Sequence, residues 1–343
     1  MNFNYNILLL SIFILTFSSC EDDDNSVTSI PERDRTEQQV IDNDSLIGYL
    51  NTHYYNSSEV NGLTNPTMQD LVISELMDGE TLPSNSSFLI NDVETLMTTH
   101  MDVEYKYYIL KIKQGEGELS PNFCDNVRTS YYGFTTDGAV FDESTSPTPI
   151  DLAVTIPGWK RVFPQFNTSS SFVSNTDGTV TFEGYGMGAM FLPSGLGYFS
   201  NFVTGIPSYS NIAFKFELMQ MELNDHDSDN IPSYMEVSDS NEFGLFDFDT
   251  DGDLIYNYID RDDDGDGTAT ASEIKIDPYS DMTLEGLQTI LDAFELMSNQ
   301  FISPISTLPD GTFTANIITL VDENENGIPN YLDDTETETV VTE

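Results

Sequence analysis

Tyr131-Tyr132-Gly133 opens an ordered series of aromatic, glycine and aspartate residues that is the most informative feature of this chain. The series continues through Asp137-Gly138, Phe141-Asp142, Ile156-Pro157-Gly158-Trp159, Pro193-Ser194-Gly195-Leu196-Gly197-Tyr198, Ile206-Pro207 and Phe214-Lys215-Phe216-Glu217-Leu218. A single ring in such a series is ordinary sheet core. The order and the spacing together are specific, and they cover about the middle third of the chain.

Short strands with glycine and proline turns surround this series. Alternating apolar residues run along the last of them, where Ile212, Phe214, Phe216 and Leu218 would share one face. The strands are predicted at 103–113, 127–134, 178–183, 188–192 and 211–222. Asn175-Thr176-Asp177-Gly178 between apolar residues predicts an added hairpin within 168–183. The pattern favours an antiparallel sheet.

In this order the residues resemble the FKBP-type peptidyl-prolyl cis-trans isomerases. That family has Tyr-x-Gly, x-Asp-Gly-x-x-Phe-Asp, Ile-x-Gly-Trp, Pro-Ser-x-Leu-x-Tyr, Ile-Pro and a last Phe-x-x-Glu-Leu strand. The resemblance implies an α+β fold over residues 101–223, in which a bent antiparallel sheet wraps around one short helix. This helix would start near Trp159 and be cut short by Pro164.

The resemblance also implies an activity and a pocket. Isomerisation of a prolyl bond needs neither nucleophile nor cofactor, because an apolar pocket already favours the twisted, less polar amide. The implied pocket has ring walls, a backbone N–H at Ile156 for a substrate carbonyl, a polar rim and an aliphatic wall. By number, its residues are Tyr131, Phe141, Asp142, Ile156, Trp159, Tyr198, Ile206 and Phe214, with Ile150 as a further wall position.

Three departures from the family pattern bear on rate and substrate preference. Phe199 replaces the usual glycine after the pocket tyrosine, Thr155 stands where an apolar residue is common, and the following loop has no histidine. Phe199 and the insertion at 168–183 keep open a second function, in which the pocket binds proline-containing segments without accelerating exchange. In either case the partners would be proline-containing segments of exported proteins.

Beyond Leu223 a 12-residue acidic motif occurs four times, each copy with carboxylate or amide side chains at positions 1, 3, 5 and 12. Ca²⁺ takes oxygen ligands from such a 12-residue loop. The predicted structural Ca²⁺ ligands are Asp225, Asp227, Asp229 and Glu236; Asp249, Asp251, Asp253 and Asp260; Asp262, Asp264, Asp266 and Glu273; and Asp322, Asn324, Asn326 and Asp333. Region 224–343 is therefore similar to thrombospondin type 3 repeats. A solvated acidic tail, or a calcium-dependent adhesive or spacer role, is the alternative.

The N-terminus has the pattern of an exported lipoprotein. Residues 1–19 form a short apolar segment, which predicts a signal peptide too short to span a bilayer. The small residues before Cys20 resemble a bacterial lipobox, and the acidic run after it is similar to that of Bacteroidetes-type lipoproteins. We expect lipidation at Cys20, an acidic tether over 20–35, and anchoring in the outer membrane, on its periplasmic or its outer face.

Residues 36–100 are predicted to be helical. Val40, Ile41, Leu46, Ile47 and Leu50 recur at helical spacing, and a second helix is predicted from Met68 to Met77.

Charge excludes one class of partner. The 59 Asp and Glu against 11 Lys and Arg give a net charge of -48, which repels nucleic acid phosphates. The chain has only two cysteines, Cys20 and Cys124, too few for a disulfide framework.

Overall fold

A six-stranded antiparallel sheet is formed by residues 94–222 in the computed structural model, which describes residues 32–237 and 243–340. The strand order is β4-β5-β10-β11-β6-β7. Its strands are β4 (Glu94–His100), β5 (Val103–Lys113), β6 (Asn126–Thr135), β7 (Val140–Asp151), β10 (Gly186–Leu192) and β11 (Ile212–Glu222). The signal peptide, the lipidation site Cys20 and most of the tether lie outside the described residues.

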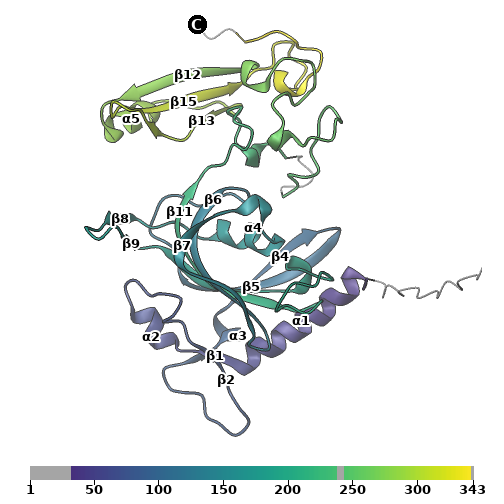
Figure 1. The fold of residues 1–343 in the computed structure, drawn as a ribbon, viewed down its shortest axis with the longest axis vertical. Coiled ribbons are helices and arrows are strands. Elements are labelled where there is room, and N and C mark those ends of the chain that lie inside the picture. The colour runs from purple at the N-terminus through teal and green to yellow at the C-terminus, as the bar shows by residue number, and fades with distance from the viewer. Residues whose placement is uncertain (1–31, 238–242, 341–343) are drawn as a thin grey trace, which may run out of the picture. The chain divides into compact units, whose positions relative to one another are not determined.

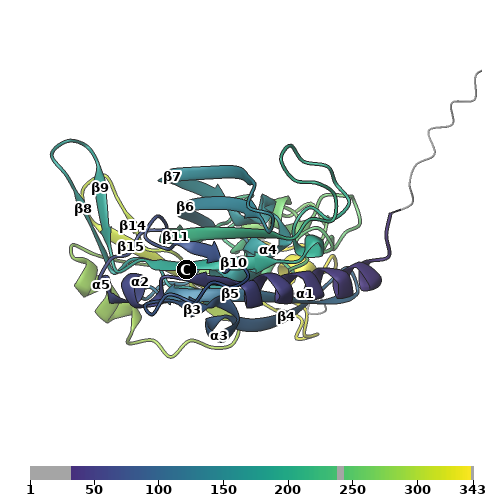
Figure 2. The same cartoon turned by 90° about the horizontal axis from the view of Figure 1, so that it is seen from below.

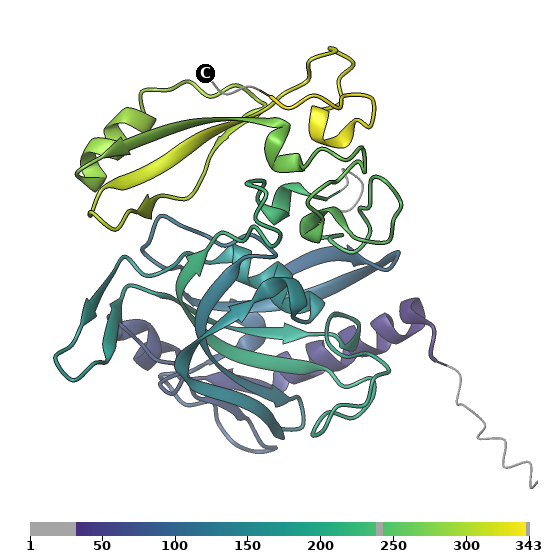
Figure 3. The same ribbon diagram turned by 45° about the horizontal axis from the view of Figure 1, so that its top comes forward.

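One face of this sheet covers a short helix, α4 (Pro157–Val162). Pro157 occupies the first turn, where a missing N–H costs nothing, and Phe163-Pro164 continues the chain as a single 3-10 turn. Trp159 and Val162 of α4 are buried against Phe214 and Phe216 of β11. Strands β6, β7 and β11 curve around α4 (Figures 1 and 3).

The opposite face of the sheet packs against the N-terminal helix α1 (Arg35–Thr52). Asp34 caps this helix, its carboxylate accepting a hydrogen bond from Glu37 N at 2.9 Å. Leu46 and Leu50 are fully buried in the second apolar core, which includes Phe191 of β10. Helix α1 runs along the sheet beside β5 (Figure 2).

Residues 53–92 form a small three-stranded sheet, where helices were expected. The strands are β1 (His53–Tyr55), β2 (Ile73–Glu75) and β3 (Ser87–Phe88), with α2 (Ser57–Gly62) and α3 (Leu89–Asp92) between and after them. The predicted helix from Met68 to Met77 was wrong. Met68 and Leu71 are buried against the sheet core, and the Met68 N–H donates to the Glu217 carboxylate at 2.6 Å. The backbone of this segment therefore finds partners outside itself.

The predicted hairpin is present as β8 (Ser171–Ser174) and β9 (Val180–Glu183), which pair antiparallel. The turn between them closes with the Asn175 N–H donating to Thr179 O at 2.8 Å. It projects from the six-stranded sheet (Figure 2).

After β11 the chain alternates between acidic loops and a second small sheet. The sheet contains β12 (Ile274–Asp281), β13 (Gln300–Ile302), β14 (Ser306–Thr307) and β15 (Phe313–Leu320), and α5 (Leu284–Leu291) packs on it. Leu287 and Leu291 bury the apolar side of α5 against Ile317. None of the helices within the described residues has the length and apolar character that crossing a membrane requires.

Candidate functional site

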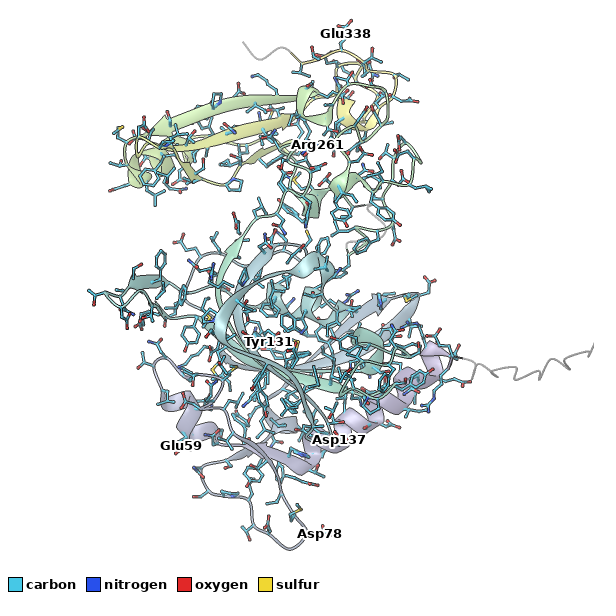
Figure 4. All side chains as sticks on the ribbon, in the orientation of Figure 1. Glu59, Asp78, Tyr131, Asp137, Arg261 and Glu338 are labelled. Carbon is cyan, nitrogen blue, oxygen red and sulfur yellow. The ribbon has the colours of Figure 1, made fainter. Side chains whose placement is uncertain are left out.

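Aromatic side chains from four elements meet on the concave face of the sheet. Tyr131 comes from β6, Phe141 from β7, Trp159 from α4 and Phe214 from β11. All four belong to one apolar core or pack against it. Figure 4 labels Tyr131 among the surrounding side chains.

Strand register explains why these rings face one another. Tyr131 pairs with Phe216 and Gly133 with Phe214, so that these four positions share one face of β6 and β11. Tyr132 points to the other face and packs against the second core. Sequence alternation therefore places every second residue of each strand toward α4.

Gly133 allows the rings to approach closely. A Cβ at this position would lie 2.7 Å from Phe141 Cε2 and 2.7 Å from Phe214 Cε1. No side chain fits there without moving the rings, so the glycine in this motif is required by packing.

The rings contact one another edge to face. Trp159 and Phe214 have centroids 5.2 Å apart at 90°, Tyr131 and Trp159 5.2 Å at 79°, and Phe141 and Phe214 5.4 Å at 87°. This is the arrangement that the ring quadrupoles favour. The Trp159 Nε1–H is buried and has no hydrogen-bond partner among the described residues.

A polar edge accompanies the rings. The Tyr131 hydroxyl donates to Asp142 Oδ2 at 3.0 Å, and Asp142 is exposed. Burial, and then the neighbouring Asp142, raises the pKa of Tyr131 to about 12. Burial and Asp142 also raise the pKa of Tyr198, so both phenols keep their protons at neutral pH.

Ile156 lies at the N-cap of α4. Its carbonyl accepts from Trp159 N at 3.1 Å, whereas its own N–H has no acceptor in the part of the chain that the structure describes. This N–H is therefore available to a bound carbonyl. Tyr198 and Ile206 come from the loop before β11, and both pack against the same core, as does Ile150. The structure thus brings together all eight residues of the implied pocket.

The four acidic loops share one backbone conformation. In each, the residue at position 6 has a positive φ: Asn230 (81°), Leu254 (80°), Gly267 (97°) and Gly327 (91°). In each, the N–H of this residue donates to the carboxylate at position 1, at 3.0, 3.1, 3.1 and 2.9 Å respectively. A 3-10 turn follows at positions 9 to 11 in every loop.

Four buried carboxylates converge at the first loop. Asp227, Asp229 and Glu236 offer oxygens that lie within 4.8 Å of one another and of an oxygen of Asp263, from the third loop. All four residues are at most 5% exposed. Asp227 Oδ2, Asp229 Oδ2 and both oxygens of Glu236 and Asp263 are buried without a hydrogen-bond partner among residues 32–237 and 243–340. Such orphaned charges need a cation or protons.

Burial and mutual repulsion act on these groups in the same direction. Burial raises the pKa of Glu236 to about 11 and that of Asp263 to about 9, with Asp229 and Asp227 as the next causes in both cases. The donor set consists only of oxygens, as the hard cation Ca²⁺ prefers. Asp225, the fourth ligand predicted here, lies beside the group, where its carboxylate accepts from the N–H of Ser228 and of Asn230.

The third loop forms a second group. Asp262, Asp264 and Asp266 offer oxygens within 4.8 Å of one another. Glu273 is fully buried, and neither of its oxygens has a hydrogen-bond partner in the described part of the chain. Its pKa is raised to about 8 by burial and then by Asp264. These four residues could hold a cation between them.

The second and fourth loops are more open. Asp249, Asp251 and Asp253 have carboxylate oxygens within 4.8 Å of one another near the surface. The pKa of Asp260 is raised mainly by its burial, and the negative charges of Asp253 and Asp251 raise it further. In the fourth loop the carboxylate of Asp333 accepts from the amides of Asn324 at 3.0 Å and Asn326 at 2.6 Å. Asp322 accepts from its own loop. The amides of Asn324 and Asn326 are therefore occupied within the fourth loop, whereas Asn330 Nδ2 is buried without a partner among the described residues.

Sequence reasoning missed Asp263. It occupies position 2 of the third loop, which supplies no ligand to that loop. The only signal was the uninterrupted run Asp262-Asp263-Asp264, one carboxylate more than a single loop uses.

Comparisons with known proteins reach only part of the chain. No family model and no curated protein matches it. A peptidyl-prolyl cis-trans isomerase from Pseudomonas syringae pv. tomato is 21% identical, over 34% of this chain and 75% of that one, with a TM-score of 0.28. FkpA from Escherichia coli is 25% identical, over 37% of this chain and 51% of that one, with a TM-score of 0.29.

These structural neighbours are FKBP-type peptidyl-prolyl isomerases. The chain spans about half the length of FkpA. Similarity at such TM-scores gives no support for an activity, which has to be inferred from side-chain geometry.

Proposed function

We propose that residues 101–223 bind proline-containing peptide segments and catalyse cis-trans isomerisation of their prolyl bonds. The observation that carries this proposal is the convergence of Tyr131, Phe141, Trp159 and Phe214 on one face of the sheet, beside the unused N–H of Ile156. Exported proteins are the proposed clients.

The geometry suits the chemistry of the twisted amide. Resonance sets a barrier of about 18–20 kcal/mol, and rotation removes both the conjugation and part of the carbonyl's polarity. A ring-lined surface solvates this less polar transition state better than water does. The Ile156 N–H would hold the flanking carbonyl, and Asp142, fixed by the Tyr131 hydroxyl, would border the peptide. No proton transfer or cofactor is involved.

A protease-coupled isomerisation assay on the full chain tests catalysis. Trp159→Ala and Asp142→Ala should each lower kcat/KM at least tenfold. Tyr131→Phe should lower it, while Tyr132→Phe, which removes a hydroxyl from the next residue on the opposite face, should not. A wild-type rate equal to that of buffer would reject catalysis. If a proline-containing peptide still bound, the function would be that of a non-catalytic binding module.

We further propose that Ca²⁺ occupies the acidic loops and has a structural role. The support is the set of buried carboxylate oxygens without partners in the first and third loops. Calorimetric titration with Ca²⁺ should show tight sites that Glu236→Gln and Glu273→Gln remove separately. Asp249→Asn in the open second loop should change the tight sites little. If Ca²⁺ did not bind, the region would be a solvated acidic tail. If a chelator abolished binding of a partner protein and pocket variants did not, an adhesive role would be favoured.

The lipid anchor at Cys20 and the outer-membrane location remain proposals from the sequence. Mass spectrometry of the protein from its native membrane should show a diacylglycerol-modified Cys20, and a Cys20→Ser variant should appear in the soluble fraction. An unmodified N-terminus would reject the anchor.

A further inference from the structure

The loop that carries Tyr198 and Ile206, residues 193–211, is held by the N-terminal helix α1. We call these residues the Tyr198 loop. They connect β10 to β11 and supply two of the eight residues of the candidate pocket. Helix α1 lies outside the segment that resembles the isomerase family, yet it contacts this loop at several points.

Asp42 of α1 makes the most buried of these contacts. Its Oδ2 accepts from Ser194 N at 2.9 Å and from Ser194 Oγ at 2.6 Å, and its Oδ1 accepts from Gln38 at 2.7 Å. Its backbone carbonyl accepts from Asn211 Nδ2 at 3.0 Å. A single residue of α1 therefore binds both ends of the Tyr198 loop, and it is 2% exposed.

Ser194 passes this constraint on to Tyr198. The Ser194 carbonyl accepts from the N–H of Gly197 and from the N–H of Phe199, each at 2.9 Å. Tyr198 stands between these two donors, so the direction of its side chain depends on where Ser194 lies.

Two arginines at the start of α1 hold the rest of the loop. The Arg35 guanidinium lies 3.9 Å from the centre of the Phe199 ring, and that of Arg33 lies 4.4 Å from the Tyr209 ring. The two rings contact each other at 5.1 Å, and Tyr209 N donates to Phe199 O at 2.6 Å. The loop is thus closed at its base, beside α1.

Both aromatic residues have an unfavourable backbone. Phe199 has φ 49° and Tyr209 has φ 64°, in the left-handed region that a bulky residue rarely adopts. Such conformations persist only where surrounding contacts fix them. Phe199, one of the three departures from the family pattern, is the residue whose ring Arg35 covers.

We propose that α1 is a positioning element of the candidate pocket, in which Asp42 and Arg35 fix the Tyr198 loop so that Tyr198 and Ile206 face the bound prolyl bond. This inference rests on the proposed function. A misplacement of about 1 Å at a reacting group lowers rates by up to about a hundredfold, so losing these contacts should affect catalysis from a distance.

Asp42→Ala and Arg35→Gln test the proposal in the full chain, with Asp44→Ala as the matched control. Asp44 is on the same helix and exposed. We expect Asp42→Ala and Arg35→Gln to lower kcat/KM at least tenfold, mainly through kcat, and Asp42→Asn to recover part of the loss. Amide exchange should accelerate at 197–210 and stay unchanged in β6. Arg35→Gln removes a partly exposed side chain, so it keeps the test valid if Asp42→Ala fails to fold.

Two results would overturn the proposal. One is faster exchange at 197–210 with kcat/KM equal to that of Asp44→Ala, which would make the contact merely structural. The other is unchanged exchange in both variants. Failure of the proposed function is recognised separately, because the wild-type chain would then show neither turnover nor binding of a proline-containing peptide, whatever the exchange rates are.

Discussion

Asp263→Asn should stabilise the chain in chelator and destabilise it in Ca²⁺. Asp263 and the three carboxylates around it offer oxygens within 4.8 Å of one another. At an effective dielectric constant of about 20, each ionised pair at this distance repels by about 3.5 kcal/mol, so the six pairs together reach about 20 kcal/mol. This exceeds the about 5–15 kcal/mol by which domains are stable. Without a cation the group must take up protons or open.

Neutralising Asp263 removes three of the six pairs, and therefore about 10 kcal/mol of the repulsion between fully ionised groups. In chelator the variant should melt above the wild-type chain. In saturating Ca²⁺ it has lost an anionic ligand, and a tenfold weaker site costs about 1.4 kcal/mol, or a few degrees in Tm.

Differential scanning calorimetry under the two conditions measures both signs. Asp44→Asn serves as the control, since it removes the same charge from an exposed side chain of α1, outside the acidic loops, and should change Tm little. If Asp263→Asn melted below the wild-type chain in both conditions, the carboxylates would not be repelling one another, and the cation site would be refuted.

Three further outcomes follow from features of the described residues. Gly133→Ala should lower Tm and kcat/KM, because overpacking between the pocket rings costs about 1–3 kcal/mol; Gly48→Ala, with free space on α1, should not, and equal effects would contradict the packing argument. The wild-type to Tyr131→Phe ratio of kcat/KM should be the same at about pH 6 and 9, since the Tyr131 pKa of about 12 keeps its proton on. The stability contributed by this raised pKa is complete below the unfolded value of 10.0 and is lost as pH rises toward 12; a ratio that changes between pH 6 and 9 would place another titration at the pocket. Cys124, which is buried and whose pKa is raised by that burial, should resist alkylation in the native chain and react on unfolding, and rapid native labelling would show that its surroundings open.

The sequence predicted the placement of the aromatic residues on one face of the sheet better than it predicted the N-terminal region. Ordered aromatic positions carry over because strand alternation fixes which side of the sheet each residue faces, as for Tyr131 and Phe214. Met68 and Leu71 have helical spacing, but the sheet core and the Glu217 carboxylate supply their partners. Tertiary contacts of this kind override local periodicity and leave no local signal.

Contacts between residues far apart in the chain were equally unpredictable from the sequence. Asp263 belongs by number to one loop and by position to another, and Asp42 binds Ser194 across 152 residues. Neither contact follows from spacing, because each depends on how separate elements pack. The β4 strand, predicted as part of a helical region, joins the six-stranded sheet through β5 for the same reason.

Because Asp263 of the third loop joins the carboxylates of the first loop, the acidic loops of this chain are not independent, interchangeable units. A synthetic dodecapeptide with the sequence of residues 225–236 would contain only three of the four buried carboxylates, and its site would be incomplete and exposed to water. Ile231 of the same loop likewise packs in one buried cluster with Tyr331, which belongs to the fourth loop. The Ca²⁺ affinity of the first loop is therefore a property of the folded chain. Grafting this loop alone onto another protein would transfer its sequence without its affinity.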